Sequence, residues 1–532
     1  MSNTYHIQIL PHGRQIKAKP GRSLMESLMD QSIFLKSDCG GKGTCGKCRV
    51  KKDLGNGESE LIHSCTFIVS EDIKIEIPES SLLSSHVISK APVSFPANFN
   101  DRFKNVAGRD CYGIATDLGT TTIAMYLCNM TKGQVFSSIS VKNPQALYGD
   151  DVMSRIGAIG QDKKNLAQLQ KLVVRAMEWG IKELLAPLDL ELDQVSQMVA
   201  VGNPAMIHIL AGVDPQSIGI SPYQPSFYDA TTIRSIDSGV TLKDVSIQTL
   251  PQVSGFIGGD ILGAALAVDL DNQPEGTLLV DLGTNGELML KGKDRLFATS
   301  CATGPAFEGA SLSCGMQATP GAIDKVNIKN PNNFPDCSFI NPSKSSELKP
   351  SGICGTGVIS AVAQLCQKNI LAPGGAFRKD MDLPALKKDD SGKFCYVLVP
   401  ENASQYGSEI FISQKDIRSV QLGKAALITG IEFLLKAAGI DTPEKIIIAG
   451  AFGTFLDKGD MMTLGMIPSM DPARVEVSGN SAGAGAIMVL CDDAFLEKSI
   501  QMSTRITTVD LACDQDFQKV FVEKLSFPLL EN

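Results

Sequence analysis

Residues 1–78 contain short runs in which apolar and polar side chains alternate, which is the pattern of half-buried β-strands. A glycine turn separates the first two runs, and Ser23 then favours the start of a short helix before the third run. The runs predict strands at Tyr5–Leu10 and at residues 15–19, 47–52 and 73–77. Two strands, a helix, a loop and two further strands indicate a small β-grasp domain over residues 1–78.

The pattern changes from residue 111 onward to apolar strands, glycine-rich turns and amphipathic helices, the longest of them expected over residues 165–185 and 420–438. One strand–turn–strand unit occurs at residues 113–127 and recurs at 278–290, each time with the letters Asp-Leu-Gly-Thr at the turn. The repeat predicts a duplicated α/β domain over residues 111–532, with a first lobe from about 111 and a second lobe from about 277.

Residues 79–110 separate these two parts of the chain. They are rich in Ser, Pro and Asn and show neither the helical nor the strand period. We therefore expect this stretch to be a linker.

Composition narrows the choice of partners and compartment. The net charge of −9 and the absence of Lys/Arg clusters argue against nucleic acid or anionic lipid as the main partner. No apolar run is long enough to span a bilayer, and residues 1–10 are polar and mixed, unlike a signal peptide. Ten of the 14 cysteines are scattered, which is typical of buried thiols in a reducing cytosol. We therefore expect a cytoplasmic protein that binds neither membrane nor nucleic acid.

The remaining four cysteines form a candidate metal site. Three of them follow a C-x5-C-x2-C pattern in a glycine-rich loop, and the fourth comes after the third predicted strand. A [2Fe–2S] cluster needs four thiolates, and glycine lets the backbone wrap closely around it and adopt positive φ. The longer first gap resembles the adrenodoxin-like branch of the ferredoxins. The predicted ligands are Cys39, Cys45, Cys48 and Cys65.

Three other interpretations of this loop are weaker. Structural zinc generally uses two Cys-x-x-Cys pairs, and only one is present here. A disulfide framework would need an oxidising compartment. Residues 41–47 match the glycine and lysine positions of a P-loop, but Cys48 replaces the hydroxyl that would hold magnesium.

The two Asp-Leu-Gly-Thr turns are a candidate phosphate site. A strand that leads through Asp into Gly-Thr places a carboxylate beside backbone N–H groups, which can hold phosphate while the carboxylate holds hydrated magnesium. One such turn could be a simple hairpin. Two matching turns, followed by a glycine turn after the apolar residues 446–448, are more specific.

Together these turns resemble the superfamily of actin, sugar kinases and Hsp70, in which two RNase H-type lobes close over ATP and Mg²⁺. The resemblance implies a first phosphate loop, a second phosphate loop and an adenosine loop. The first would contain Asp117, Gly119, Thr120, Thr121 and Thr122; the second Asp281, Gly283, Thr284, Asn285, Gly286 and Glu287; and the third Gly450, Ala451, Phe452 and Gly453. Asp117 and Asp281 would be catalytic through magnesium.

Some polar residues of this domain keep two interpretations each. Asp260 follows Gly-Gly before an apolar run, so it is either a general base or a helix N-cap. Glu308 and Asp324 lie in glycine-rich stretches and are either functional or structural. The polar stretch at residues 143–155, which includes Arg155, is either a lid or a set of salt bridges.

A [2Fe–2S] domain fused to this kind of ATP-binding domain resembles the ATP-dependent reductive activators of corrinoid proteins. The resemblance covers nearly the whole chain and includes the stretches at residues 202–206, 303–310, 315–316, 321–323, 352–355, 449–453 and 479–486. Asn203-Pro204 departs from it, because the family has Asn-Thr there. The family implies one-electron reduction of Co(II) to Co(I) for methyl transfer, with a corrinoid protein as partner and a low-potential electron donor. It also suggests a homodimer.

Three alternatives stay open at the level of sequence. A small-molecule kinase with a redox sensor would use Asp260 as its base. An Hsp70-like module would use ATP only to gate a binding partner. An activator of a radical dehydratase is less consistent with this chain, since those proteins place one [4Fe–4S] cluster between two subunits.

Overall fold

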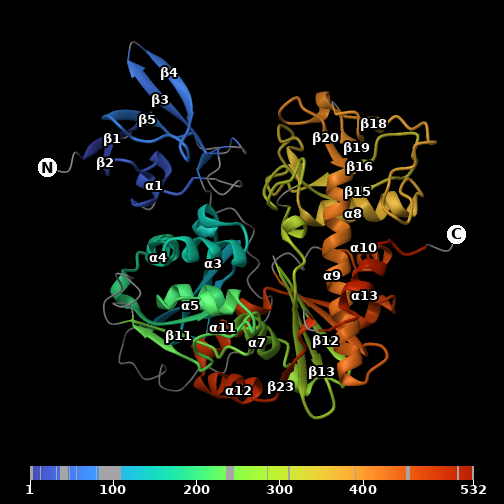
Figure 1. Ribbon diagram of the computed structural model, residues 1–532. Coiled ribbons are helices and arrows are strands. Elements are labelled where there is room, and N and C mark those ends of the chain that lie inside the picture. The colour runs from blue at the N-terminus through green and yellow to red at the C-terminus, as the bar shows by residue number, and fades with distance from the viewer. Residues whose placement is uncertain are drawn as a thin grey trace.

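The computed structural model describes residues 4–11, 13–31, 33–35, 43, 46, 48–55, 57–78, 81–82, 110–132, 134–234, 245–283, 285–309, 312–389, 391–450, 456–511 and 514–529. The predicted linker therefore lies almost entirely outside the described residues. Figure 1 shows the N-terminal domain above the first lobe, with the second lobe beside them. The described residues include no helix that is both long enough and apolar enough to cross a membrane.

The N-terminal domain is a five-stranded sheet in the order β2-β1-β5-β3-β4, packed against one helix. Its elements are β1 (Tyr5–Leu10), β2 (Arg14–Ala18), α1 (Leu24–Met29), β3 (Arg49–Gly55), β4 (Glu58–His63) and β5 (Ile73–Glu76). Ser23 caps α1 in a reciprocal pair with Glu26, which confirms the predicted helix start. Strand β4 was not predicted, because only Ile62 of its six residues is buried and no alternation is visible.

The first lobe is built on a six-stranded sheet in the order β10-β11-β9-β6-β7-β8. Its strands are β6 (Tyr112–Leu118), β7 (Thr122–Asn129), β8 (Gln134–Lys142), β9 (Val195–Val201), β10 (Thr232–Arg234) and β11 (Ser246–Thr249). Its helices are η2 (Pro144–Tyr148), α3 (Val152–Gln161), α4 (Lys164–Leu185), α5 (Pro204–Ala211) and α7 (Gly259–Ala267). Helix α4 confirms the helix expected over residues 165–185.

The second lobe has a matching sheet in the order β22-β21-β12-β13-β14-β23. Its strands are β12 (Thr277–Leu282), β13 (Gly286–Lys291), β14 (Leu296–Cys301), β21 (Lys445–Ala449), β22 (Val475–Gly479) and β23 (Ile506–Thr508). Its helices are α9 (Gln414–Ala438), α10 (Lys458–Leu464), α11 (Ser481–Cys491), α12 (Asp493–Ser503) and α13 (Phe517–Glu523). Helix α9 begins before the predicted residue 420, because Ser413 and Asp416 form a capping box ahead of it.

An insertion between β14 and α9 forms the upper part of the second lobe in Figure 1. It contains helix α8 and two three-stranded sheets, in the orders β16-β15-β17 and β18-β19-β20. Its elements are β15 (Ala322–Asn327), β16 (Asp336–Phe339), β17 (Gly352–Ile353), α8 (Gly355–Gln367), β18 (Leu386–Lys388), β19 (Phe394–Val399) and β20 (Ile410–Ser413). Helix α9 runs from this insertion down to the main sheet.

The two large sheets show that the lobes are duplicates of one α/β unit, which confirms the predicted fold class. In both, the predicted hairpin is antiparallel and its first strand also pairs in parallel with a later strand. Asp117 lies opposite Ala124 and Val201, and Asp281 takes the equivalent place opposite Glu287 and Ala449. The two carboxylates are therefore presented at equivalent points of the two lobes.

Helices α7 and α11 pack against each other where the lobes meet. Their contact depends on glycine: a Cβ atom on Gly485 would lie 2.1 Å from the carbonyl oxygen of Gly263. Two helix backbones can approach this closely only without side chains between them.

Candidate functional site

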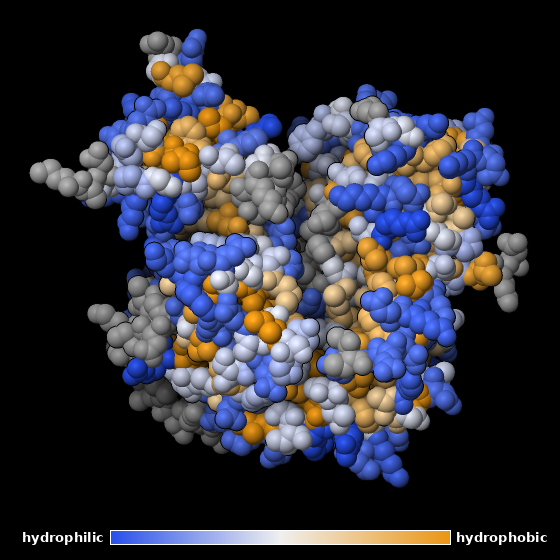
Figure 2. All heavy atoms as spheres, in the orientation of Figure 1, coloured by the Kyte–Doolittle hydropathy of each residue, from blue (hydrophilic) through white to orange (hydrophobic). Residues whose placement is uncertain are grey.

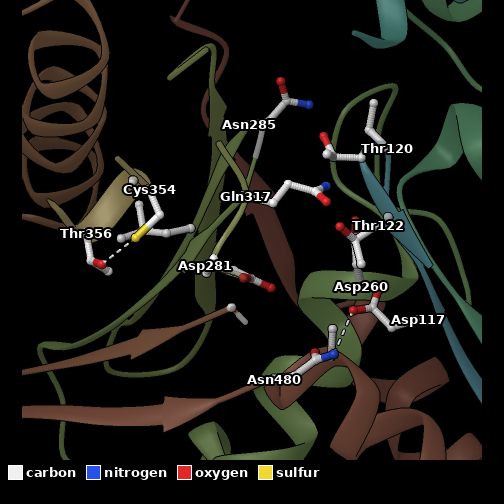
Figure 3. A pocket seen from close by; sticks show the side chains of 18 of the residues that line it. Asp117, Thr120, Thr122, Asp260, Asp281, Asn285, Gln317, Cys354, Thr356 and Asn480 are labelled. Atoms are coloured by element: carbon white, nitrogen blue, oxygen red, sulfur yellow. Dashed lines mark hydrogen bonds between the residues drawn. The ribbon is translucent and has the colours of Figure 1, made fainter. Parts of the chain in front are cut away.

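A cavity of about 500 Å³ lies between the lobes and is lined by both Asp-Leu-Gly turns. Figure 3 shows Asp117, Asp260 and Asp281 reaching into it from three different elements. Two of these come from the equivalent hairpins, and the third comes from α7. The cavity therefore brings together the three carboxylates that the sequence selected.

The first turn joins β6 to β7 at residues 119–121. Glycine is required at its start, because a Cβ atom on Gly119 would lie 2.5 Å from the carbonyl oxygen of Thr122. Thr120, Thr121 and Thr122 all line the cavity. The amide of Asn203, the N-cap of α5, donates to Thr120 Oγ1 over 3.0 Å. This bond fixes the hydroxyl of Thr120 at the cavity wall.

Three successive carbonyl groups of this turn are held by one neighbouring segment. Asn143 Nδ2 donates to Gly119 O over 3.0 Å, Arg155 Nη2 to Thr120 O over 2.6 Å, and the Asn143 N–H to Thr121 O over 2.7 Å. In a trans peptide the N–H points opposite to the carbonyl of the same unit. The N–H groups of residues 120–122 therefore point away from this segment.

The second turn joins β12 to β13 and is closed by a hydrogen bond of 3.0 Å from the Gly283 N–H to Asn285 O. Gly283, Asn285 and Glu287 line the cavity, whereas Gly286 begins β13 and lies outside that lining. Thr284 lies outside the described residues.

Of the predicted adenosine loop, Gly450 is described and Ala451, Phe452 and Gly453 are not. Gly450 has a φ of 96°, and a Cβ atom there would lie 2.9 Å from Asp281 Oδ1 and 2.5 Å from Leu282 O. Only glycine combines that conformation with that approach. The start of the third predicted loop thus touches the second phosphate turn.

Asp260 occupies the first turn of α7 and not the N-cap, which is Gly258. The N-cap interpretation is therefore wrong. Its Oδ1 accepts the N–H of Ile261 over 2.9 Å, and its side chain lines the cavity. The position at the start of the helix stabilises a carboxylate through the positive end of the helix dipole.

Four carboxyl groups of this cavity have raised pKa values. Burial raises the pKa of Asp117 to about 7, and the negative charge of Asp260 adds to this increase. The hydrogen bond from Asn480 lowers the pKa and offsets part of it. Burial also raises the pKa of Asp281 to about 8 and that of Asp260 to about 6. The pKa of Glu287 is raised by burial and by the neighbouring charges of Asp260 and Asp281. Such mutual repulsion is relieved by a cation.

This arrangement fits hydrated magnesium better than a metal ion enclosed by protein ligands. Among the described residues, no group of three or more His, Cys, Asp or Glu side chains could hold a metal ion. Magnesium usually keeps several water molecules and binds nucleotide phosphates with one or two carboxylates. The separate carboxylates around this cavity have the chemistry for that role.

Several residues of the cavity were not selected from the sequence. Asn480 donates to Asp117 Oδ2 over 3.0 Å and to the Tyr126 hydroxyl over 2.9 Å, as Figure 3 shows for the first bond. From the insertion, the cavity receives Gln317 and Thr356, which were not selected either. It also receives Asp324, whose role the sequence left open, and Cys354, from a stretch that carries the family resemblance. Asn480 lies in the stretch 479–486 that carries the family resemblance, after a strand and before a helix rich in Gly and Ala, but no role was predicted for it.

The structure gives the positions of two residues whose interpretation was left open. Asp324 lines the cavity, and its Oδ1 is buried without a hydrogen-bond partner among the described residues. Arg155 is fully buried and so is not part of a surface lid. Nothing is described of the Glu308 side chain.

Cys48 and Cys65, two of the four predicted cluster ligands, lie together in the N-terminal domain. Their Sγ atoms are 3.3 Å apart, and Cys48 is fully buried. Cys39 and Cys45 lie outside the described residues. Gly43 and Gly46 of the same loop have φ values of 74° and 68°, as expected for a chain wrapped around a cluster. Two adjacent thiols and left-handed glycines fit the predicted iron–sulfur site.

Three family models match consecutive parts of the chain. A model described as the 2Fe-2S iron-sulfur cluster binding domain matches residues 7–72. A model of the RACo middle region matches residues 112–273, and one of the C-terminal domain of RACo, the ASKHA domain, matches residues 275–532.

Similar whole proteins are known. The corrinoid activation enzyme RamQ of Eubacterium limosum is 28% identical, over 92% of this chain and 93% of that protein. A [Co(II) methylated amine-specific corrinoid protein] reductase of Methanosarcina barkeri is 27% identical, over 78% of this chain and 77% of that protein. The solved structure of a reductive activator for corrinoid, iron-sulfur protein covers 98% of both chains, with 25% identity and a TM-score of 0.76.

Proposed function

The chain belongs to the ATP-dependent reductive activators of corrinoid proteins, and from that premise we propose which of its residues bind, orient and react. Its partner is a corrinoid protein, whose cobalt it returns from Co(II) to Co(I). It is an ATP-hydrolysing enzyme with a [2Fe–2S] domain. When bound, the cluster supplies single electrons and Mg²⁺ neutralises phosphate charge.

The observation that supports the nucleotide site is the meeting of the two duplicated turns in one cavity. We assign the N–H groups of residues 120–122 and of Asn285 to the phosphates, since such turns form anion-binding concavities. Asp117 and Asp281 would hold hydrated magnesium, which would neutralise phosphate charge, and Asp260 accepts a proton from the attacking water. Thr284 and the loop at residues 450–453 complete the nucleotide contacts.

Asn480 is added to this assignment as a positioning residue. Its amide donates to Asp117 and so fixes which oxygen of that carboxylate remains for the magnesium shell. The same side chain caps α11, because its Oδ1 accepts the Gly483 N–H over 3.0 Å. One residue thus joins a carboxylate of the first lobe to a helix of the second.

The four cysteines Cys39, Cys45, Cys48 and Cys65 are assigned to the cluster. The electron passes from this domain to the cobalt, and a low-potential donor then returns one electron to the domain. Every interval of about 59 mV by which the cobalt's reduction potential lies below that of the cluster lowers the equilibrium constant for the one-electron transfer tenfold. If the two-lobed ATPase domain binds one oxidation state of the corrinoid protein more tightly, it shifts that equilibrium, and ATP hydrolysis then returns the domain to its starting conformation.

The surroundings of the reaction complete the proposal. The scattered thiols favour a reducing, cytoplasmic location, and the family suggests a homodimer. Size-exclusion chromatography with light scattering on purified protein tests the homodimer. Cell fractionation tests the cytoplasmic location.

The decisive experiment supplies a low-potential reductant and a corrinoid protein in the Co(II) state. Absorption of Co(I) should rise only when ATP and an intact cluster are both present, and ATP hydrolysis should increase when the corrinoid protein is added. The control is Cys48→Ser, which should lose the cluster but still bind nucleotide. Reduction that runs equally well without ATP would contradict the proposed coupling, and transfer of phosphate to a small metabolite would replace it by a kinase activity.

A further inference from the structure

A short segment of the first lobe, residues 142–148, lies between the first phosphate loop and the ferredoxin domain. A narrow cleft separates this segment from the ferredoxin domain. The ferredoxin domain lines it with Met29, Phe34 and Leu35, and the segment lines it with Lys142, Asn143, Pro144, Ala146 and Leu147. The apolar side chains of the ferredoxin domain and the first lobe also form one hydrophobic cluster. The segment is therefore part of the surface on which the ferredoxin domain rests.

The same segment is bonded to the phosphate loop through buried polar groups. Asn143, which is fully buried, holds the carbonyls of Gly119 and Thr121, as described above. Arg155 holds the carbonyl of Thr120 and also donates to Gln145 Oε1 over 3.0 Å, inside η2. Breaking a buried hydrogen bond of this kind would leave an unpaired polar group in the interior, which is strongly unfavourable. A displacement of the loop is therefore passed to η2.

Salt bridges anchor the ferredoxin domain on the adjoining helix. Asp30, at the C-terminal end of α1, accepts from Arg175 Nη1 over 2.8 Å and from Lys171 Nζ over 3.1 Å, both on α4. Arg175 Nη1 also donates to the carbonyl of Met29 over 3.1 Å. Arg22 of the same domain donates to Asp30 as well. Figure 2 shows hydrophilic surface over α4 below the ferredoxin domain.

The anchored position places a cluster ligand beside η2. A cavity of about 330 Å³ between the two domains is lined by Cys65 and Ile68 of the ferredoxin domain and by Leu147 and Tyr148 of η2. A continuous series of contacts thus leads from the carbonyl of Thr120 through Arg155 and η2 to the cavity that Cys65 lines.

We propose that nucleotide in the interlobe cavity and the docking of the ferredoxin domain on α4 and η2 are coupled, with Arg155 as the positioning residue that connects them. The inference rests on the proposed binding of ATP phosphates at residues 119–122. Phosphates that bind to that loop shift its carbonyl groups, and Arg155 and Asn143 transmit this shift to η2. The ferredoxin domain then dissociates from its docking surface on α4 and η2. The release frees the electron carrier to reach the cobalt.

Coupling of this kind is reciprocal. If nucleotide weakens docking by some factor, then weakening the docking by mutation must tighten nucleotide binding by up to the same factor. A residue that only supports the fold would not produce this reciprocal effect. The test therefore measures both directions on the full-length holoprotein.

The first measurement compares the double variant Lys171→Gln/Arg175→Gln with wild type. We expect the variant to bind the non-hydrolysable analogue AMPPNP with Mg²⁺ about fivefold more tightly by calorimetry. In wild type, AMPPNP should speed hydrogen exchange in peptides covering residues 24–30. Lys164→Gln/Lys182→Gln is the matched control, because both lysines are exposed on the same helix and the change removes the same two charges. It should leave both quantities unchanged.

The second measurement tests the route. When both proteins also carry Arg155→Lys, the Lys171→Gln/Arg175→Gln change should no longer alter the affinity for AMPPNP. This holds whatever the absolute affinity of the Arg155→Lys protein is. If Arg155→Lys does not fold, Gln145→Met serves instead, since methionine has a similar volume but lacks the oxygen through which η2 accepts from Arg155. A difference that persists in the folded variant overturns the assignment to this route.

The outcomes separate the inference from the function on which it rests. If wild type does not bind AMPPNP, the proposed nucleotide site fails. If wild type binds AMPPNP but exchange at residues 24–30 is unaffected and the double variant has wild-type affinity, the coupling is overturned and the nucleotide site stands.

Discussion

Asp281 is a single residue whose burial costs stability, which is consistent with the role proposed for it. In the nucleotide-free protein its pKa is raised to about 8 by burial and by the charges of Asp117 and Asp260. A carboxyl whose folded pKa is raised favours the folded state at low pH, and that contribution is lost as the pH rises through the folded value. Above about pH 8 the protein therefore carries an unfavourable buried charge.

The first prediction follows from this loss of stability with rising pH. Asp281→Asn should abolish magnesium-dependent ATP hydrolysis but stabilise the nucleotide-free protein at pH 8.5 by about 1 kcal/mol. The gain should shrink at pH 6, where the wild-type carboxyl is already protonated. Thermal unfolding at both pH values checks this, with Asp294→Asn in the exposed β13–β14 turn as control. Loss of stability at pH 8.5 would contradict the prediction.

The second prediction separates the two roles of Asn480. Asn480→Ala should destabilise by about 1 kcal/mol, because the cap of α11 is lost, and should lower kcat for ATP. Asn480→Ser should keep the cap and recover the stability, yet kcat should remain low because no amide donates to Asp117. Unfolding and ATPase assays on both variants decide this. Full ATPase activity in the serine variant would leave Asn480 with a purely structural role.

Residue types in a local pattern could be predicted, and contacts across the chain could not. Asp117 and Asp281 were identifiable because each is followed by Leu-Gly-Thr after an apolar strand. Asn480 reaches Asp117 across 363 positions of sequence, so no local window contains both. Arg155 was expected in a lid or a set of salt bridges, since its burial against the first turn depends on tertiary packing.

At the scale of elements, the crossing of α7 and α11 sets how closely the lobes approach. The third prediction is that Gly485→Ala destabilises by about 1–3 kcal/mol, because its methyl group must displace the Gly263 carbonyl. ATP hydrolysis should fall with it, since α7 carries Asp260.

The matched control for this variant is Gly157→Ala in α3. Nothing lies within 4 Å of a Cβ atom at Gly157, so alanine should be neutral or stabilising by up to about 1 kcal/mol. Equal effects of the two substitutions on melting temperature would show that the helix crossing tolerates a side chain.

Elements with a strong period were predicted well, and exposed or capped ones were not. Strand β1 and helix α4 follow their hydrophobic patterns almost to the residue. Strand β4 has one buried residue and is fixed by pairing with β3, which is tertiary information. Helix α9 extends beyond its apolar stripe because its start is set by the Ser413 cap.

At the scale of the whole molecule, the chain joins an electron carrier to an ATP-driven clamp. The fourth prediction concerns that covalent link. Protease cleavage at a site engineered between residues 79 and 110 should leave ATPase activity and the cluster intact but slow Co(I) formation, because tethering supplies a high effective concentration. Excess free ferredoxin domain should restore part of the rate. An unchanged rate at micromolar protein after cleavage would show that docking alone is sufficient.

The order of the sites along the chain has a consequence for biosynthesis. Cys65, the last of the four proposed cluster ligands, leaves the ribosome long before Asn480, with on the order of 400 residues between them. At about 5–20 residues per second, that interval lasts roughly 20–80 seconds. The cluster ligands are therefore exposed to iron–sulfur assembly factors before any part of the second lobe has completed the nucleotide cavity. A nascent chain can thus acquire its redox centre before it is able to consume ATP.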